Sequence, residues 1–175
     1  MKLTKMTLLL VAGLALAACT NPARFGADGS GGAGGAGAGV GSGTVIPGSV
    51  NDPRSTAYFN ETVGDRVLFA VNESAVNDGG RVTLDSQAAW LLANTDFTAV
   101  IEGHADEQGT REYNVALGAR RASAAREYLI SRGVAGNRLT TVSYGKERPL
   151  EICSDETCYA KNRRAVTVLA AGLSG

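Results

Sequence analysis

A glycine tract divides this 175-residue chain into a part that can form a core and a part that cannot. Between Gly26 and Gly48, eleven of 23 residues are glycine, interleaved with Ala and Ser and almost no apolar bulk. Such a stretch buries too little apolar surface to offset the entropy lost on ordering. We therefore predict a flexible tether over residues 19–57 and one folded domain over residues 58–175, because that length suits a single core.

Ahead of the tether, the sequence has the pattern of an export signal. Lys2 and Lys5 precede an apolar run over residues 6–16. The run is shorter than the roughly 20 residues of a membrane-spanning helix, so we expect residues 1–18 to be a signal peptide and not an uncleaved anchor.

The end of this segment, Leu16-Ala17-Ala18-Cys19, resembles the lipobox of bacterial lipoproteins. The resemblance implies that the thiol of Cys19 carries lipid, and several acyl chains on one residue give firm anchoring. The next residue is Thr20, where lipoproteins retained at the inner membrane have Asp. The expected location is therefore the outer membrane, with the domain in the periplasm.

The charge balance argues against a polyanionic partner. The chain has 17 basic and 17 acidic residues, and loss of Lys2 and Lys5 with the signal leaves 15 against 17. No global positive field attracts nucleic acid, and we expect no nucleic-acid partner.

Beyond residue 58, short β-rich runs alternate with helical patterns, which is typical of an α/β fold. Thr110 is the predicted N-cap of a helix that runs to about Arg132, Gly133 its C-cap, and Gly103 the end of the second strand. Trp90 is expected to pack in the core. Together these patterns predict a mixed four-stranded sheet with helices on one face, an α+β sandwich. The expected strands are 67–69, 99–101, 139–143 and 165–169, and the first helix is 83–94.

The run 100–110, VIEGHADEQGT, followed by Tyr113-Asn114, Leu117-Gly118 and Arg120-Arg121-Ala122, resembles the OmpA-like peptidoglycan-binding domain. The segments 142–147 and 161–166 narrow the resemblance to the peptidoglycan-associated lipoproteins. It covers residues 65–170 and implies noncovalent binding of the diaminopimelate residue of peptidoglycan stem peptides. It also implies a role in the Tol-Pal system, which serves envelope integrity and cell division, with TolB and other Tol proteins as partners.

The resemblance assigns the ligand contacts to Asp106, after the second strand, and Arg121, on the following helix. The free end of diaminopimelate carries an ammonium and a carboxylate on one carbon, so Asp106 is expected to accept from the first and Arg121 to fork onto the second. Asn114, Leu117 and Arg121 share a helix stripe that we expect to line the pocket. The alternatives are a purely structural salt bridge for the charged pair and ordinary core packing for Leu117.

Several further residues are candidates for the same pocket. Gly109 allows close approach of the backbone, and free N–H groups at the helix start near Thr110 suit a carboxylate or a sugar oxygen. One of Arg163 and Arg164 is expected to support the pocket and the other to cap the sheet edge, and the sequence does not rank them. The resemblance also implies contacts from the loop after the first strand, Asn72-Glu73-Ser74.

The only histidine, His104, lies near Asp106 and Glu107, which suggests a metal site or a wall-cleaving hydrolase. The ligand number and spacing do not suit zinc, and no nucleophile motif or phosphate loop is present. We therefore expect no enzyme activity, no metal and no cofactor, with His104 ending its strand and packing or hydrogen-bonding locally. Another OmpA-like wall anchor outside the Tol system is the alternative function, and the hydrolase is a second.

Cys153 and Cys158 remain after lipidation of Cys19, in a domain expected to be exported. A disulfide between them is predicted because oxidising compartments favour such bonds. A Cys-x4-Cys metal site is the alternative.

Overall fold

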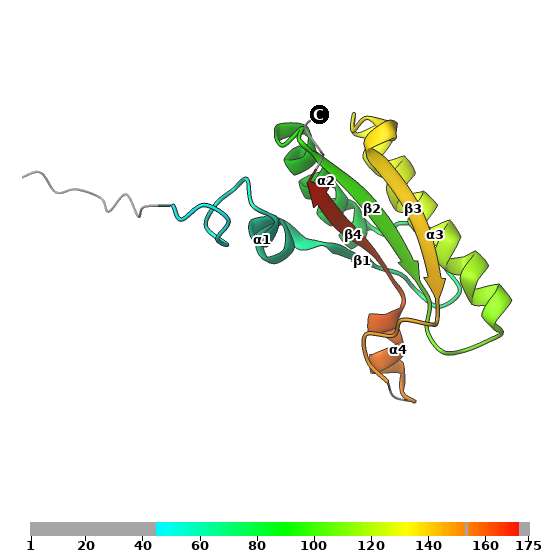
Figure 1. The fold of residues 1–175 in the computed structure, drawn as a ribbon. Coiled ribbons are helices and arrows are strands. Elements are labelled where there is room, and N and C mark those ends of the chain that lie inside the picture. The colour runs from blue at the N-terminus through cyan, green and yellow to red at the C-terminus, as the bar shows by residue number, and fades with distance from the viewer. Residues whose placement is uncertain (1–44, 153, 172–175) are drawn as a thin grey trace, which may run out of the picture. The chain divides into compact units, whose positions relative to one another are not determined.

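The computed structural model describes residues 45–152 and 154–171. Their four strands form one sheet in the order β1-β4-β2-β3, in which β2 is parallel to β3 and antiparallel to β4 (Figure 1). The predicted mixed four-stranded α/β fold is confirmed. The elements in chain order are α1 (Thr56–Tyr58), the π-helix η1 (Phe59–Gly64), β1 (Arg66–Leu68), α2 (Asp78–Ala93), β2 (Phe97–His104), α3 (Arg111–Ser131), the 3-10 helix η2 (Gly136–Arg138), β3 (Leu139–Gly145), α4 (Glu156–Asn162) and β4 (Arg164–Ala171).

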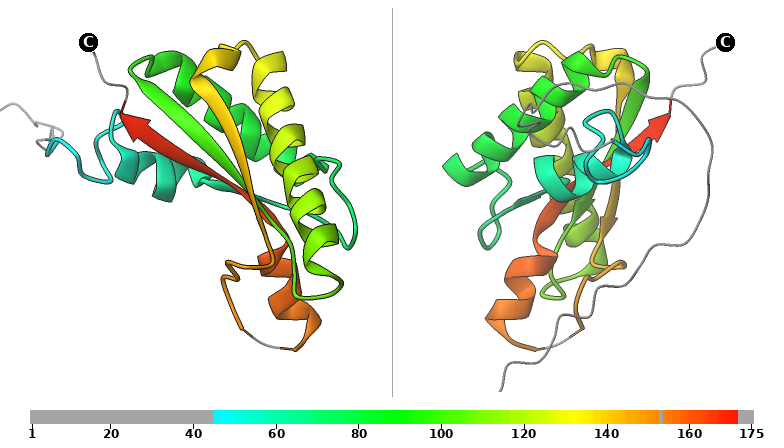
Figure 2. Two further views of the ribbon diagram at one scale, coloured as in Figure 1. Left: turned by 45° about the vertical axis from the view of Figure 1, so that its right-hand side comes forward. Right: turned by 90° about the vertical axis from the view of Figure 1, so that its left-hand side faces the viewer.

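Helices α2 and α3 pack on one face of the sheet, as predicted (Figure 2). The core lies between them and the sheet and includes Leu84, Leu91 and Ile101, none of which is exposed. Trp90 packs against the rings of Phe59 and Phe97, at centroid distances of 5.0 and 5.1 Å. Its predicted role in packing is therefore confirmed.

The ends of the two long helices follow local capping. For α3, the hydroxyl of Thr110 accepts from the N–H of Tyr113 at 3.2 Å, and Gly133 follows the helix with φ +99°, both as predicted. Helix α2 begins five residues earlier than predicted. The side chain of Asn77 accepts from the N–H of Gly80 at 2.8 Å and so caps a first turn that glycines make intrinsically weak.

Gly103 does not end the second strand, which corrects the prediction. Strand β2 continues to His104, and a Cβ atom on Gly103 would lie 1.8 Å from the carbonyl oxygen of Gly118 on α3. The glycine is therefore needed for the close approach of helix and strand.

The folded part also extends further toward the N-terminus than predicted. The side chain of Ser55 accepts from the N–H of Tyr58 to cap α1, and the indole N–H of Trp90 donates to the carbonyl of Pro53 at 2.8 Å. The predicted signal peptide, Cys19 and most of the predicted tether lie outside the described residues. Within the described part of the chain, no helix is long and apolar enough to cross a membrane.

Candidate functional site

The predicted site residues gather where the parallel strands β2 and β3 end side by side (Figure 1). Three connections meet there: residues 69–77 between β1 and α2, residues 105–110 between β2 and α3, and the described residues 146–152 and 154–163 between β3 and β4, which include α4. We call these segments, with the adjoining first three turns of α3 and the end of β2, the loop end of the sheet. Ligand sites commonly lie outside the carboxyl ends of parallel strands.

Asp106 is buried at the loop end and pairs with Arg163. One carboxylate oxygen accepts from Nη1 of Arg163 at 3.1 Å, and the other accepts from the N–H of Gln108 at 3.3 Å. A carboxylate has about four acceptor positions, so these two bonds leave Asp106 able to accept more.

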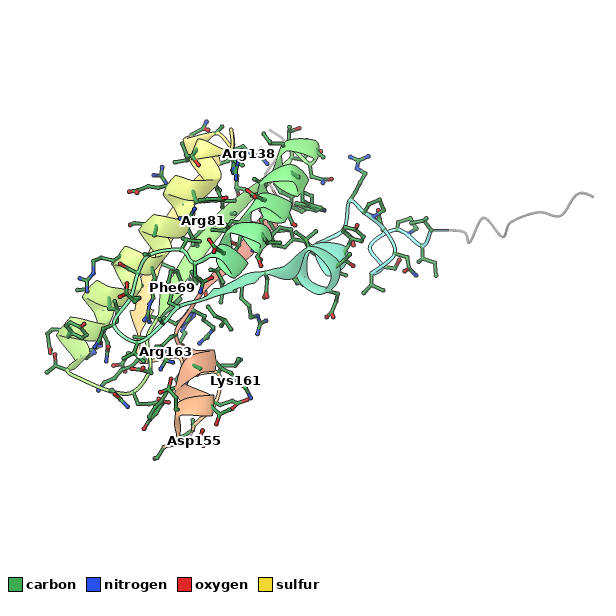
Figure 3. The ribbon with its side chains drawn as sticks, turned by 180° about the vertical axis from the view of Figure 1, so that it is seen from behind. Phe69, Arg81, Arg138, Asp155, Lys161 and Arg163 are labelled. Carbon is green, nitrogen blue, oxygen red and sulfur yellow. The ribbon has the colours of Figure 1, made fainter. Side chains whose placement is uncertain are left out.

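Of the adjacent Arg163 and Arg164, Arg163 is the one that contacts Asp106. It is buried and donates to the carbonyl of Phe69 at 3.2 Å, to Asp106, and to both oxygens of Glu156. Burial lowers its pKa, but its hydrogen bonds to Glu156 and Asp106 and the charges of these two acids together raise it more, so the net shift is upward. Figure 3 shows Arg163 at the junction of α4 and the sheet, beside Phe69. Arg164 instead donates to backbone carbonyls, away from Asp106.

Arg121 is completely buried and donates to three backbone carbonyls. Nε bonds Glu73 at 2.8 Å, Nη1 bonds His104 at 2.8 Å, and Nη2 bonds Ala70 at 3.1 Å. Its guanidinium also lies over the ring of Phe69, 5.3 Å from the centroid. Burial lowers the pKa of Arg121 to about 10, which leaves the side chain charged at neutral pH.

The structure thus brings Asp106 and Arg121 to one place without pairing them. Asp106 forms its ion pair with Arg163, and the guanidinium of Arg121 is turned toward backbone, so the expected fork is not open in this conformation. The alternative of a direct salt bridge between Asp106 and Arg121 is not observed among the described residues. The sequence did not show which of Arg163 and Arg164 lies at the pocket. In the structure, Arg163 is the one that contacts Asp106.

The helix stripe that was predicted to line the pocket is buried. Asn114 donates through Nδ2 to the carbonyl of Gln108 at 2.8 Å, and its Oδ1 is buried without a partner among the described residues. Leu117 is also buried but lies outside the main apolar core cluster. This stripe therefore faces the loop end as well as the sheet.

The start of α3 is shaped by Gly109 and a lysine. Gly109 has φ +92°, a conformation that favours glycine, and its carbonyl accepts from Nζ of Lys146 at 2.8 Å. Thr110 uses its hydroxyl as the helix cap. Both residues lie at the loop end, and their contact with a ligand stays a prediction.

The loop after the first strand contributes backbone to the site. The carbonyl of Glu73 binds Arg121, and Asn72, with φ +57°, accepts through its side chain from the hydroxyl of Tyr113 at 3.3 Å. No bond from the Ser74 side chain is among those described. The loop therefore covers Arg121 and is tied to α3 at its tip.

Helix α4 and its polar contacts were missed by the sequence-based prediction. Asn162 is fully buried and connects three segments, donating to the Glu107 side chain and the Glu151 carbonyl and accepting from the N–H groups of Leu150 and Glu151. The signal that predicts such a helix is Asp155, whose side chain caps it.

Of the two residues predicted to end the second strand, Gly103 and His104, it is His104 that ends β2. Its ring packs against Tyr144 with ring centroids 5.6 Å apart. Neither ring nitrogen makes a hydrogen bond within the described residues, although Nε2 lies 3.5 Å from a carboxylate oxygen of Glu102, and the predicted packing is observed. Burial, assisted by Arg164 and Arg148, lowers its pKa to about 4. In the described residues, no group of three or more His, Cys, Asp or Glu side chains is placed to hold a metal.

Cys158 is buried in α4 and disulfide-bonded. Cys153, its predicted partner, lies outside the described residues, so the pairing remains a prediction.

Comparisons with known proteins agree with this architecture. A sequence model described as the OmpA family matches residues 68–163. A peptidoglycan-associated lipoprotein of Rhizobium meliloti is 49% identical over 160 residues, which cover 91% of this chain and 84% of that protein. The crystal structure of the peptidoglycan-associated lipoprotein from Burkholderia pseudomallei superimposes with a TM-score of 0.61 at 36% identity, covering 69% of this chain and 98% of that one.

A more distant solved structure shares the fold alone. The C-terminal domain of Helicobacter pylori MotB is 22% identical with a TM-score of 0.58, over 62% of this chain and 86% of that one. The family match and the identity to the Rhizobium protein are decisive, and the chain belongs to the OmpA family, among the peptidoglycan-associated lipoproteins.

Proposed function

We propose that this chain is an outer-membrane lipoprotein that binds the diaminopimelate end of peptidoglycan stem peptides without catalysis. The observation that carries the proposal is the placement of a buried acid, Asp106, and a buried base, Arg121, at one loop end in a chain of this family. Asp106 has spare acceptor capacity for an ammonium, and Arg121 remains charged to meet a carboxylate.

Binding in this way requires a change at the loop between β1 and α2. The carbonyls of Ala70 and Glu73 occupy Nη2 and Nε of Arg121. A ligand carboxylate replaces these acceptors when the loop moves aside, and a charged acceptor forms the stronger bond. The proposed ligand therefore competes with the protein's own backbone for Arg121.

The test is sedimentation with purified, diaminopimelate-containing sacculi. Asp106→Asn keeps the shape and removes the charge, and Arg121→Lys keeps a charge and removes the fork; each should weaken binding at least about tenfold. Matched controls come from the exposed pair Asp85 and Arg132, as Asp85→Asn and Arg132→Lys. Thermal unfolding shows that each variant is folded, and wild-type sedimentation by a folded Asp106→Asn would refute the proposal.

The place in the cell and the protein partner are further parts of the proposal. Lipid on Cys19 would anchor the chain in the outer membrane, and labelling with radioactive palmitate should be lost in Cys19→Ser. Immobilised TolB should retain the wild-type chain if it works in the Tol-Pal system. Retention by sacculi but not by TolB would instead favour another OmpA-like wall anchor.

A hydrolase that uses His104 is the weaker candidate. The ring is 2% exposed, and its pKa of about 4 makes it a poor base at neutral pH. We expect no release of muropeptides from sacculi; release that disappears in His104→Ala would restore this candidate.

A further inference from the structure

One arginine at the loop end is shared between two acids of very different exposure. Nη1 of Arg163 lies 3.1 Å from Asp106 and 3.4 Å from Glu156, while Nη2 makes a second, short bond to Glu156. The Asp106 side chain is 10% exposed and that of Glu156 is 65% exposed. Glu156 therefore takes the two-point contact with Arg163 and leaves Asp106 a single bond to it.

This sharing keeps negative charge available on Asp106. If Arg163 paired with Asp106 alone, the fork of the guanidinium would turn both its terminal nitrogens toward that carboxylate and neutralise it. Glu156, whose side chain is largely exposed, draws one of these nitrogens away from Asp106. Asp106 consequently remains an acceptor for a cation.

Four of the charges at this place also balance. Asp106 and Glu156 are negative, Arg121 and Arg163 are positive, and the sum of the four is zero. A cluster whose positive and negative groups balance and are kept apart complements a zwitterion better than it complements a simple cation or anion.

We propose that Glu156, on α4, is a specificity-determining residue that sets this balance and so selects a zwitterionic ligand end over a purely cationic or anionic one. The inference rests on the proposed function, because it concerns the same ligand site. Glu156 acts through Arg163 and the local charge, and it does not itself contact the stem peptide.

The substitution Glu156→Gln should change the affinity for cationic and for anionic ligand ends in opposite directions. Without Glu156, Arg163 turns to Asp106 and the four-group site gains a net positive charge. Binding of a cationic end should then weaken by about three- to tenfold, whereas binding of an anionic end should tighten by about two- to fivefold. A variant that merely loosened α4 would weaken every ligand alike.

Three synthetic stem tripeptides that differ only at the free end of diaminopimelate make the test. One carries the natural ammonium and carboxylate, one has the carboxylate amidated and is cationic there, and one has the amine acetylated and is anionic there. Calorimetry gives the affinity of each for the wild-type chain and for Glu156→Gln. Asp96→Asn is the control, since it removes one exposed acidic charge at the other end of β2. Glu156→Asp should restore the wild-type order, and Glu156→Ala repeats the test with a side chain that cannot hydrogen-bond.

The outcomes separate the two proposals. Opposite shifts for the amidated and acetylated peptides, absent in Asp96→Asn, support a specificity role for Glu156. A uniform change, or none, in folded Glu156→Gln and Glu156→Ala overturns it while the proposed function stands. If the wild-type chain binds none of the three peptides, the proposed function fails first, and the specificity inference fails with it.

Discussion

The core beneath the helices and the loop end of the sheet are both buried, but they bury opposite chemistry. Leu84, Leu91 and Ile101 are unexposed in the core, and Arg121 and Asn162 are equally unexposed at the loop end. Among the described residues, the buried side-chain polar atoms without a partner all belong to His104, Glu107 and Asn114, at the loop end. Apolar burial stabilises a fold, whereas an unsatisfied polar atom costs free energy. We infer that the core stabilises the fold, whereas the unsatisfied polar groups of the loop end lower the stability of the free protein and are available to bind a ligand.

The largest effect is expected where α3 lies so close to the end of β2 that no side chain fits between them. In Gly103→Ala, the new Cβ would lie 1.8 Å from the backbone oxygen of Gly118, so helix α3 has to move off β2. We expect a loss of about 4 kcal/mol or more in the free energy of unfolding, measured by urea titration. Gly79→Ala is the control, because its nearest neighbour is 3.6 Å away and the change should be close to neutral. A loss below about 1 kcal/mol for Gly103→Ala would show that the close contact is adaptable.

A cavity in the core should lower stability but not affinity. Leu91→Ala removes an unexposed side chain and should cost about 3 kcal/mol in the free energy of unfolding. Its neighbour Leu92 is 46% exposed, and Leu92→Ala should cost less than about 1 kcal/mol. At temperatures where both variants are folded, each should sediment with sacculi like the wild-type chain. Weaker sedimentation by folded Leu91→Ala would mean that the core and the loop end are coupled.

The loop end should make the domain sensitive to acid. The pKa of His104 is lowered from 6.5 to about 4 in the folded state, chiefly by burial, so the unfolded state binds its proton first. Above pH 6.5 His104 has no effect, and as the pH falls from 6.5 to 4 the folded state should lose about 2–3 kcal/mol through this residue. Urea titrations across this range, with His104→Gln as the reference that lacks the ionisable ring, measure the difference. Parallel pH profiles for the two proteins would contradict the assignment.

The sequence predicted the features that depend on local signals and missed those that depend on contacts between distant residues. Periodicity and capping residues indicated α3, with its cap at Thr110 and its end at Gly133, because those signals are local. The role of Gly103 depends on Gly118, which is far along the chain, and no local pattern contains that contact. The sequence-based prediction treated Gly103 as a turn residue and therefore wrongly placed the end of the strand there.

The sequence predicted which residues form the candidate site, but not which of them contact one another. Resemblance pointed to Asp106 and Arg121, which do lie together at the loop end. Which arginine contacts Asp106 depends on where α4 places Arg163, and on the backbone carbonyls that satisfy Arg121. Such choices among several donors and acceptors are decided by three-dimensional geometry, which residue types alone do not specify.

The smallest change in the free energy of unfolding is expected for Asn114, and a comparison with Asn162 tests the role of the loop end. Both asparagines are buried, but they differ in whether the amide oxygen has a hydrogen-bond partner. Asn162 uses both its amide oxygen and its nitrogen, whereas Oδ1 of Asn114 has no partner among the described residues. Asn162→Leu should therefore cost about 2–4 kcal/mol in the free energy of unfolding, while Asn114→Leu should change it by less than about 1 kcal/mol, since losing one bond is offset by removing an unsatisfied acceptor. Sacculus binding should nonetheless fall about fivefold in Asn114→Leu, because Oδ1 is then no longer there to accept from the ligand. If both variants lose equal stability, Oδ1 is already satisfied in the free protein, and the loop end gives up less for binding than its geometry indicates.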